Sequence, residues 1–155
     1  MNKLELYHAA LSAELRSQKL YATLARSFHH PETSAFFNEL VRLEKNHEQK
    51  LREAFAAEFP DPAPSGEIKL GRELQELDFS DPQVLLEYAI SREDYAREQY
   101  LALAAEIEDA DLKALALRLA AEEEGHKSLL LAEMSRIQGA LRWFDPSELA
   151  GLMED

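Results

Sequence analysis

Apolar residues recur at steps of three and four along four long segments of the chain, and charged residues fill most of the positions between them. This spacing is typical of amphipathic α-helices that bury one face. The chain has only five Gly and six Pro in 155 residues, and no Asn-Gly or Asp-Gly pair that would mark a hairpin of strands. The sequence therefore predicts an all-α protein with helices at about 3–29, 31–58, 81–108 and 112–139 or slightly beyond.

Proline and glycine divide these helices into two hairpins. Pro31 follows the first helix, and the Asp81-Pro82 pair is a suitable start for the third. We expect hairpin 1 at about 3–58, a crossover at 59–80 and hairpin 2 at about 81–140. The crossover opens with three prolines and a glycine, can hold a short helix at 70–77, and is long enough to run the length of a bundle.

Residues 1–142 are the right length for one helical bundle with a real core. The remaining tail, residues 143–155, has a short helical segment after Asp145-Pro146. It carries the apolar residues Trp143, Phe144, Leu149, Leu152 and Met153. We expect this tail to cover the end of the bundle or a partner subunit, so the sequence favours a homodimer.

A repeat with a constant offset of 79 positions relates the two hairpins. Each half has a Glu, then a Tyr seven positions later, and then a Glu-x-x-His motif whose Glu lies 30 positions after the first Glu. The pairs are Glu14 and Glu93, Tyr21 and Tyr100, Glu44 and Glu123, and His47 and His126. Several apolar positions share the offset, so the repeat includes the residues that set helix register.

The four glutamates and two histidines of the repeat fall on the apolar stripes of the predicted helices. Each buried ionised group costs about several kcal/mol unless opposite charge compensates it. The alternative is an ion-pair network without metal, in which Arg97 and Gln18 would be the partners of the glutamates. One Arg cannot balance the charge of four Glu. Two divalent ions balance the four carboxylates. The pattern therefore predicts a di-metal site with the ligands Glu14, Glu44, His47, Glu93, Glu123 and His126.

The ligand types restrict the metal. The chain has no Cys, which excludes thiolate zinc sites and iron–sulfur clusters. Carboxylate and imidazole ligands fit iron or manganese, and also zinc. The i, i+3 spacing of Glu-x-x-His places both side chains on one helix face, where the carboxylate can bridge two ions.

Other polar residues have simpler interpretations. Tyr21 and Tyr100 are packed aromatics or hydrogen-bond donors to the ligand carboxylates. Arg97 lies one turn after Glu93 and either pairs with a buried carboxylate or extends outward along its aliphatic stem. The remaining candidates fall off the apolar stripes or at a helix end and are interpreted as solvated or capping residues: His8, His29, His30, Glu122 and Glu124.

A formal charge of −13 argues against nucleic acid as a partner, because such binding needs clustered Lys and Arg. No segment approaches the roughly 18 to 20 apolar residues of a membrane span, and the opening residues lack the apolar run of a signal peptide. The sequence therefore predicts a cytoplasmic protein without a membrane partner.

With its ligands in this order, the chain resembles the ferritin-like superfamily, specifically rubrerythrin-type di-iron four-helix bundles, over nearly its whole length. The resemblance implies that Glu14 and Glu93 are terminal ligands and that Glu44 and Glu123 bridge the irons. Two features differ from rubrerythrins: Ala96 stands where they have an additional Glu, and a cysteine-ligated rubredoxin domain is missing from this sequence. An external electron donor would therefore be needed for turnover.

The leading functional hypothesis is a non-haem di-iron protein that oxidises Fe(II) or reduces peroxide or dioxygen, which makes it an oxidoreductase of the ferroxidase or peroxidase type. A protein that binds iron for storage or delivery without turnover is one alternative. A di-iron hydroxylase of an organic substrate is another, and it would require an apolar pocket leading to the metals.

Overall fold

The computed structural model describes residues 2–60 and 75–142, with side chains described as far as residue 139. Its elements are α1 (Lys3–Ser27), α2 (Pro31–Phe55), α4 (Pro82–Glu106) and α5 (Ala110–Arg142). The described ranges contain no strand. The predicted all-α, four-helix fold is therefore confirmed.

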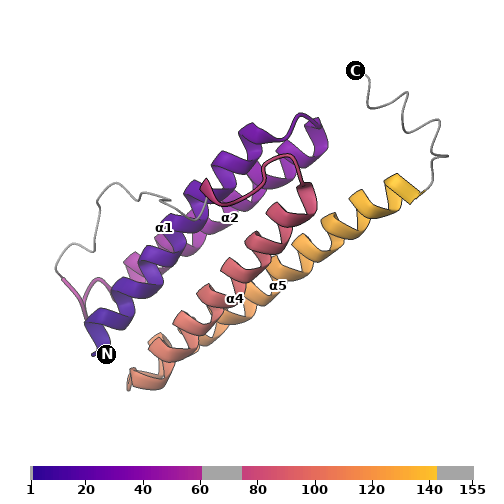
Figure 1. Ribbon diagram of the computed structural model, residues 1–155. Helices are drawn as coiled ribbons and strands as arrows, with labels where there is room; N and C mark the ends of the chain where they lie inside the picture. Colours follow the sequence, from indigo (N-terminus) through magenta and orange to yellow (C-terminus); the bar gives the residue numbers. More distant parts are fainter. Residues whose placement is uncertain (1, 61–74, 143–155) are drawn as a thin grey trace.

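Two antiparallel hairpins lie side by side in this bundle (Figure 1). The pair α1 and α2 forms one hairpin and the pair α4 and α5 forms the other, and α1 packs along α4 to join them. Among the neighbouring pairs α1–α2, α4–α5, α1–α4 and α2–α5, the last has the sparsest contact. The bundle is therefore less tightly closed on the side where α2 and α5 face each other.

Side-chain caps fix where three of the helices begin. Asn2 accepts a hydrogen bond from the Glu5 backbone N–H at 2.8 Å and completes a capping box with that residue. Asp81 caps α4 ahead of Pro82, as the sequence predicts. Asp109 accepts backbone hydrogen bonds at the start of α5, so this helix begins at Ala110, inside the predicted turn.

The helix ends differ from the predictions by a few residues. Helix α2 ends at Phe55, three residues earlier than expected. Ala56 keeps helical backbone angles, and the Phe59 N–H still donates to the Phe55 carbonyl at 2.8 Å, so the helix passes into a turn before Pro60. The predicted helix at 70–77 lies mostly outside the described residues, and the predicted tail at 143–155 lies wholly outside them. The domain boundary at 142 and the homodimer therefore stay predictions.

Two apolar clusters fill the interior, one on each side of a polar layer. Along α1, Glu14 lies between Leu11 of the first cluster and Leu20 of the second. The first cluster includes Leu11, Leu51, Phe55, Tyr100, Leu103 and Leu119, and the second includes Leu20, Leu24, Phe37, Leu40, Leu86 and Leu130. The repeat exchanges the clusters, because Leu103 corresponds to Leu24, Leu51 to Leu130 and Leu119 to Leu40. The halves are thus related by an approximate twofold axis through the polar layer.

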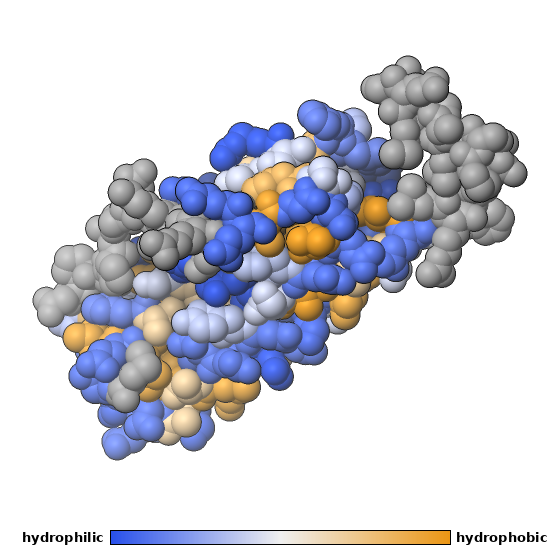
Figure 2. All heavy atoms as spheres, viewed as in Figure 1, coloured by the Kyte–Doolittle hydropathy of each residue, from blue (hydrophilic) through white to orange (hydrophobic). Residues whose placement is uncertain are grey.

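Most of the visible surface is hydrophilic, with apolar patches scattered over it (Figure 2). None of the helices among the described residues is both long enough and apolar enough to cross a membrane.

Candidate metal centre

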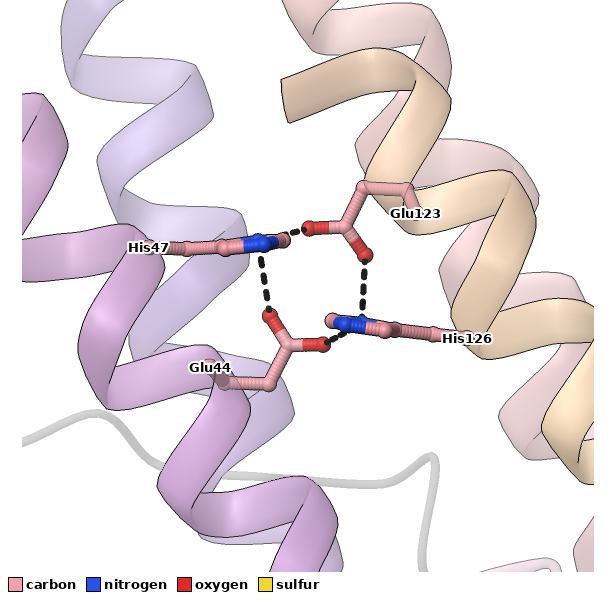
Figure 3. Close-up of side chains that lie close together, drawn as sticks. All are labelled: Glu44, His47, Glu123 and His126. Carbon is pink, nitrogen blue, oxygen red and sulfur yellow. Dashed lines mark hydrogen bonds and ion pairs between the residues drawn. The ribbon is translucent and has the colours of Figure 1, made fainter. Parts of the chain in front are cut away.

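The polar layer consists of the six predicted ligands, and every helix contributes to it. Helices α1 and α4 each supply one glutamate, whereas α2 and α5 each supply a Glu-x-x-His pair. The exposed fractions are 6% for His126, 3% for His47, 1% for Glu93 and 0% for Glu14, Glu44 and Glu123. Ligand atoms from the two Glu-x-x-His pairs lie within 4.8 Å of one another (Figure 3).

The carboxylates of Glu44 and Glu123 each reach both histidines. Glu123 Oε1 lies 2.9 Å from Nδ1 of His47, and its Oε2 lies 3.5 Å from Nδ1 of His126. Glu44 Oε1 lies 2.8 Å from Nδ1 of His126, and its Oε2 lies 3.9 Å from Nδ1 of His47. The two imidazole rings stack at 4.9 Å between centroids with their planes 15° apart. Glu44 and Glu123 are therefore shared between the two histidines.

The other two carboxylates divide the centre into two half-sites. Glu14 Oε1 lies 3.4 Å from Nδ1 of His47, and Glu93 Oε2 lies 3.7 Å from Nδ1 of His126. We call Glu14 with His47 the His47 half-site, and Glu93 with His126 the His126 half-site. Both half-sites share Glu44 and Glu123.

Two buried tyrosines hold the unshared carboxylates. The Tyr100 hydroxyl donates a hydrogen bond to Glu14 Oε1 at 2.5 Å, and the Tyr21 hydroxyl donates one to Glu93 Oε1. Burial, aided by the surrounding carboxylates, raises the pKa of both tyrosines well above its usual value, so both remain donors. Each tyrosine therefore fixes one oxygen of its glutamate. In Glu93 the other oxygen faces His126, whereas in Glu14 the same Oε1 lies near both Tyr100 and His47.

The atoms left without partners test whether a metal fits. Oε2 of each of the four glutamates is buried and has no hydrogen-bond partner. A buried carboxylate oxygen without a partner is costly, at about 1–3 kcal/mol or more. The unpartnered oxygens surround two imidazoles in a site without sulfur, which is the donor set of iron, manganese and zinc. The residues present therefore fit a pair of divalent ions.

The charge distribution also shows that positive charge is needed. Burial, followed by repulsion from Glu14, raises the pKa of Glu44 and Glu123 well above the usual range. Burial opposes ionisation of Glu14 as well, but hydrogen bonds from its neighbours outweigh burial and lower its pKa to about 2. Burial disfavours the charged form of His126, yet its contacts with Glu44 and Glu93 raise its pKa to about 10. Four ionised carboxylates are thus incompatible here without added cations.

Glu122 is a site residue that the sequence analysis missed. Its Oε2 lies 2.8 Å from Nε2 of His47, and its Oε1 lies 4.0 Å from the Lys50 ammonium group. The interpretation of Glu122 as a purely solvated residue is therefore wrong, whereas Glu124 is 52% exposed as expected. The signal in the sequence was a break in the repeat, because the position equivalent to Glu122 is Leu43.

Arg97 does not lie in the apolar stripe. Ala96 occupies the buried position there at 1% exposure, whereas the Arg97 side chain is 38% exposed and its Nε lies 3.6 Å from Glu124 Oε2. Its predicted role beside a ligand carboxylate is wrong, and the alternative of an outward side chain is the one observed. Long basic side chains can extend along a helix edge in this way, with the charged end near an acidic neighbour. His8, by contrast, lies against the Tyr7 ring and outside the cluster.

A recess of about 400 Å³ on the sparsely packed α2–α5 side reaches both histidines. We call it the histidine recess. It is lined by Leu43, Asn46, His47, Lys50, Glu122, Gly125, His126 and Leu129. These residues are four pairs at the 79-residue offset, so the recess lies on the approximate twofold axis. Of the six predicted ligands, His47 and His126 are the two that line it.

Comparison with known proteins agrees with this geometry. The family model described as Rubrerythrin matches residues 5–76 and 85–150. No protein with curated annotation matches the chain.

Solved structures share the fold. A hypothetical protein from Pyrococcus furiosus is 26% identical, with a TM-score of 0.74 and coverage of 94% of each chain. An uncharacterised conserved protein from Magnetospirillum magnetotacticum MS-1 is 21% identical, with a TM-score of 0.67 and coverage of 84% of this chain and 92% of that one. A ferritin-like, diiron-carboxylate protein from Bacillus anthracis str. Ames is 17% identical, with a TM-score of 0.69 and coverage of 85% and 94%. Because the family model spans most of its length and its four helices enclose the Glu and His cluster, the chain belongs to the rubrerythrin family, with its ferritin-like di-iron fold.

Proposed function

We propose that the protein binds two iron ions through Glu14, Glu44, His47, Glu93, Glu123 and His126, and that it couples oxidation of Fe(II) to reduction of peroxide or dioxygen. The observation that carries the proposal is the set of four buried carboxylates, each with an unpartnered Oε2, arranged around two stacked imidazoles. Four negative charges match two divalent cations. Manganese and zinc suit the same donor atoms, so the metal is a point for experiment.

When bound, two Fe(II) ions supply the two electrons that reduction of peroxide to water requires. The protein's own residues do the rest. Tyr21 and Tyr100 keep Glu93 and Glu14 oriented, and Glu44 and Glu123 hold the two half-sites at a fixed separation. The apolar clusters on both sides keep water from the polar layer, while the histidine recess admits small reactants. An external donor returns the electrons in repeated turnover.

The histidine recess also favours a second candidate function, hydroxylation of an organic substrate. Its volume of about 400 Å³ is far larger than the volume of a small oxidant such as peroxide, and it lies in the range of ligand pockets. Leu43 and Leu129 contribute apolar surface beside the histidines. Iron binding for storage or delivery is the remaining alternative, and it predicts loading without turnover.

The test begins with protein purified without added metal. Anaerobic titration should end at two Fe(II) per chain, and saturating metal should raise the melting temperature by about 10 °C, since ligand at a thousand times its Kd contributes about 4 kcal/mol. Fe(II) that remains after addition of hydrogen peroxide is then followed with a colorimetric chelator. The protein should consume Fe(II) faster than the same iron free in buffer.

Glu123→Ala removes a carboxylate that both half-sites share, so it should abolish binding of at least one ion and the fast consumption of Fe(II). Glu124→Ala is the matched control, because that neighbouring carboxylate is exposed and pairs with Arg97. Two ions bound by the Glu123→Ala variant with unchanged affinity would contradict the ligand assignment. Two ions bound by the native protein without accelerated oxidation would favour storage or delivery.

A further inference from the structure

The six ligands obey the repeat, but their immediate surroundings do not. Of the four repeat-related pairs that line the histidine recess, only His47 and His126 are identical. The other pairs are Leu43 with Glu122, Asn46 with Gly125, and Lys50 with Leu129. The recess therefore has a charged end, where Lys50 faces Glu122, and an end where the equivalent positions are both leucine.

This asymmetry places a carboxylate on one histidine alone. Glu122 Oε2 lies 2.8 Å from Nε2 of His47 as an ion-pair contact, and this oxygen is buried without a hydrogen-bond partner. The ammonium group of Lys50, 4.0 Å from the second oxygen, helps to keep this carboxylate in place. On the other side of the axis the equivalent of Glu122 is Leu43, a side chain that cannot accept a hydrogen bond.

The contact matters because both histidines turn Nδ1 towards the glutamates. Nδ1 of His47 faces Glu123, and Nδ1 of His126 faces Glu44. An imidazole that binds metal through Nδ1 carries its proton on Nε2, and a carboxylate that accepts this proton fixes the tautomer and makes the ligand more basic. Beside His47, Glu122 places a carboxylate oxygen 2.8 Å from Nε2, within reach of that proton.

We propose that Glu122 is a positioning residue that makes the two half-sites unequal, so that the His47 half-site binds metal more tightly and fills first. The inference rests on the proposed two-ion centre and adds an order of filling to it. Carboxylates that orient a ligating histidine typically change metal affinity about 10- to 100-fold. The two binding steps should differ by a factor in that range.

Zn(II) titration by calorimetry, in competition with a chelator of known affinity, tests the order without any measurement of activity. The native protein should bind two ions in two resolved steps. Glu122→Leu, which copies the residue of the equivalent position, should weaken the first step about 10- to 100-fold and leave the second unchanged, so that the two steps merge. Glu124→Leu is the control and should keep both steps.

A spectroscopic measurement separates positioning from a general structural effect. In protein loaded with one equivalent of Zn(II), the ¹⁵N signals of His47 should show metal on Nδ1 and a hydrogen-bonded proton on Nε2, while His126 remains metal-free. Glu122→Gln, which keeps an acceptor, should retain this preference in part. Adding Leu43→Glu to Glu122→Leu should move the preference to His126.

The outcomes are distinguishable. Two ions bound in two unchanged steps by Glu122→Leu would overturn the inference and leave the proposed function standing. Loss of one whole equivalent in that variant would also overturn it, because Glu122 would then be a ligand. Failure of the native protein to bind two ions would instead overturn the proposed function itself.

Discussion

The two hairpins are alike at the buried metal centre and different at its rim. Tyr21 and Tyr100 are both fully buried, and each donates a hydrogen bond to a glutamate of the centre. At the rim, by contrast, the repeat pairs Glu122 with Leu43 and Lys50 with Leu129, so each charged residue has a leucine at the equivalent position of the other hairpin. The interior positions must satisfy buried charges, so they allow few residue types. The rim positions are partly exposed, and there the two halves have different side chains around the same buried glutamates and histidines.

Substitution of the tyrosines should have the largest effect on the similarity of the two halves, because each tyrosine holds a glutamate of the opposite half of the repeat. Tyr21 lies in α1 but holds Glu93 of α4, whereas Tyr100 lies in α4 but holds Glu14 of α1. Tyr100→Phe should therefore weaken metal binding at the His47 half-site, and Tyr21→Phe should weaken it at the His126 half-site, each about 10- to 100-fold. Zn(II) titration followed by the ¹⁵N signals of the two histidines measures which half-site is affected.

Tyr7→Phe provides the control for this pair. Tyr7 is also buried, at 3% exposure, but it packs against Phe55 and Phe59 instead of the centre. It should leave both affinities unchanged. If Tyr21→Phe weakened the His47 half-site, the crossed arrangement of the hydrogen bonds would be wrong.

A smaller effect should follow when the histidine recess is filled. A Cβ built at Gly125 meets no atom within 4 Å, so the leucine of Gly125→Leu can enter the recess without displacing the backbone. Under the proposed function, reactants reach the histidine edge through this space, so Fe(II) oxidation by peroxide should slow several-fold while the equilibrium affinity for Zn(II) stays unchanged. Stopped-flow mixing and calorimetry measure these two quantities.

Ala121→Leu is the matched variant, because Ala121 lines a different recess of about 370 Å³ that includes Arg97 and Leu101. No ligand of the centre lines that recess, so the oxidation rate should not change. Equal rates for Gly125→Leu and the native protein would mean that reactants enter by another path.

The sequence predicted the interior of the protein better than its rim. A buried position needs a particular residue type at a particular helical phase, so the 79-residue repeat and the apolar stripes were enough to place four glutamates, two histidines and two tyrosines in the interior. Arg97 failed because it lies at the edge of the stripe, where steps of three and of four lead to different faces. Only the packing, with Ala96 buried and Arg97 paired with Glu124, distinguishes them.

Glu122 could not be placed from the sequence for a related reason. The Glu122 side chain lies outside the apolar stripe of α5, is 36% exposed, and reaches across to His47 of α2. Helix periodicity describes one helix at a time and carries no information on how far apart two helices lie. The reach of Glu122 to His47 depends on the sparse packing between α2 and α5, which becomes visible only in three dimensions.

The smallest expected effect concerns the helix backbone at the same rim. Gly125 lies inside α5, and a glycine in a helix interior costs about 0.5–1 kcal/mol relative to alanine. Because the added methyl group meets no neighbour, Gly125→Ala should raise the free energy of unfolding by about that amount, measured by urea denaturation without metal. Gly139→Ala, also with open space around its Cβ, should give an increase of the same sign. Gly125→Ala could stabilise the metal-free protein and also slow Fe(II) oxidation. In that case the missing side chain at Gly125 would keep the recess open at the expense of helix stability. The difference between Asn46 and Gly125 would then affect access to the centre and not folding.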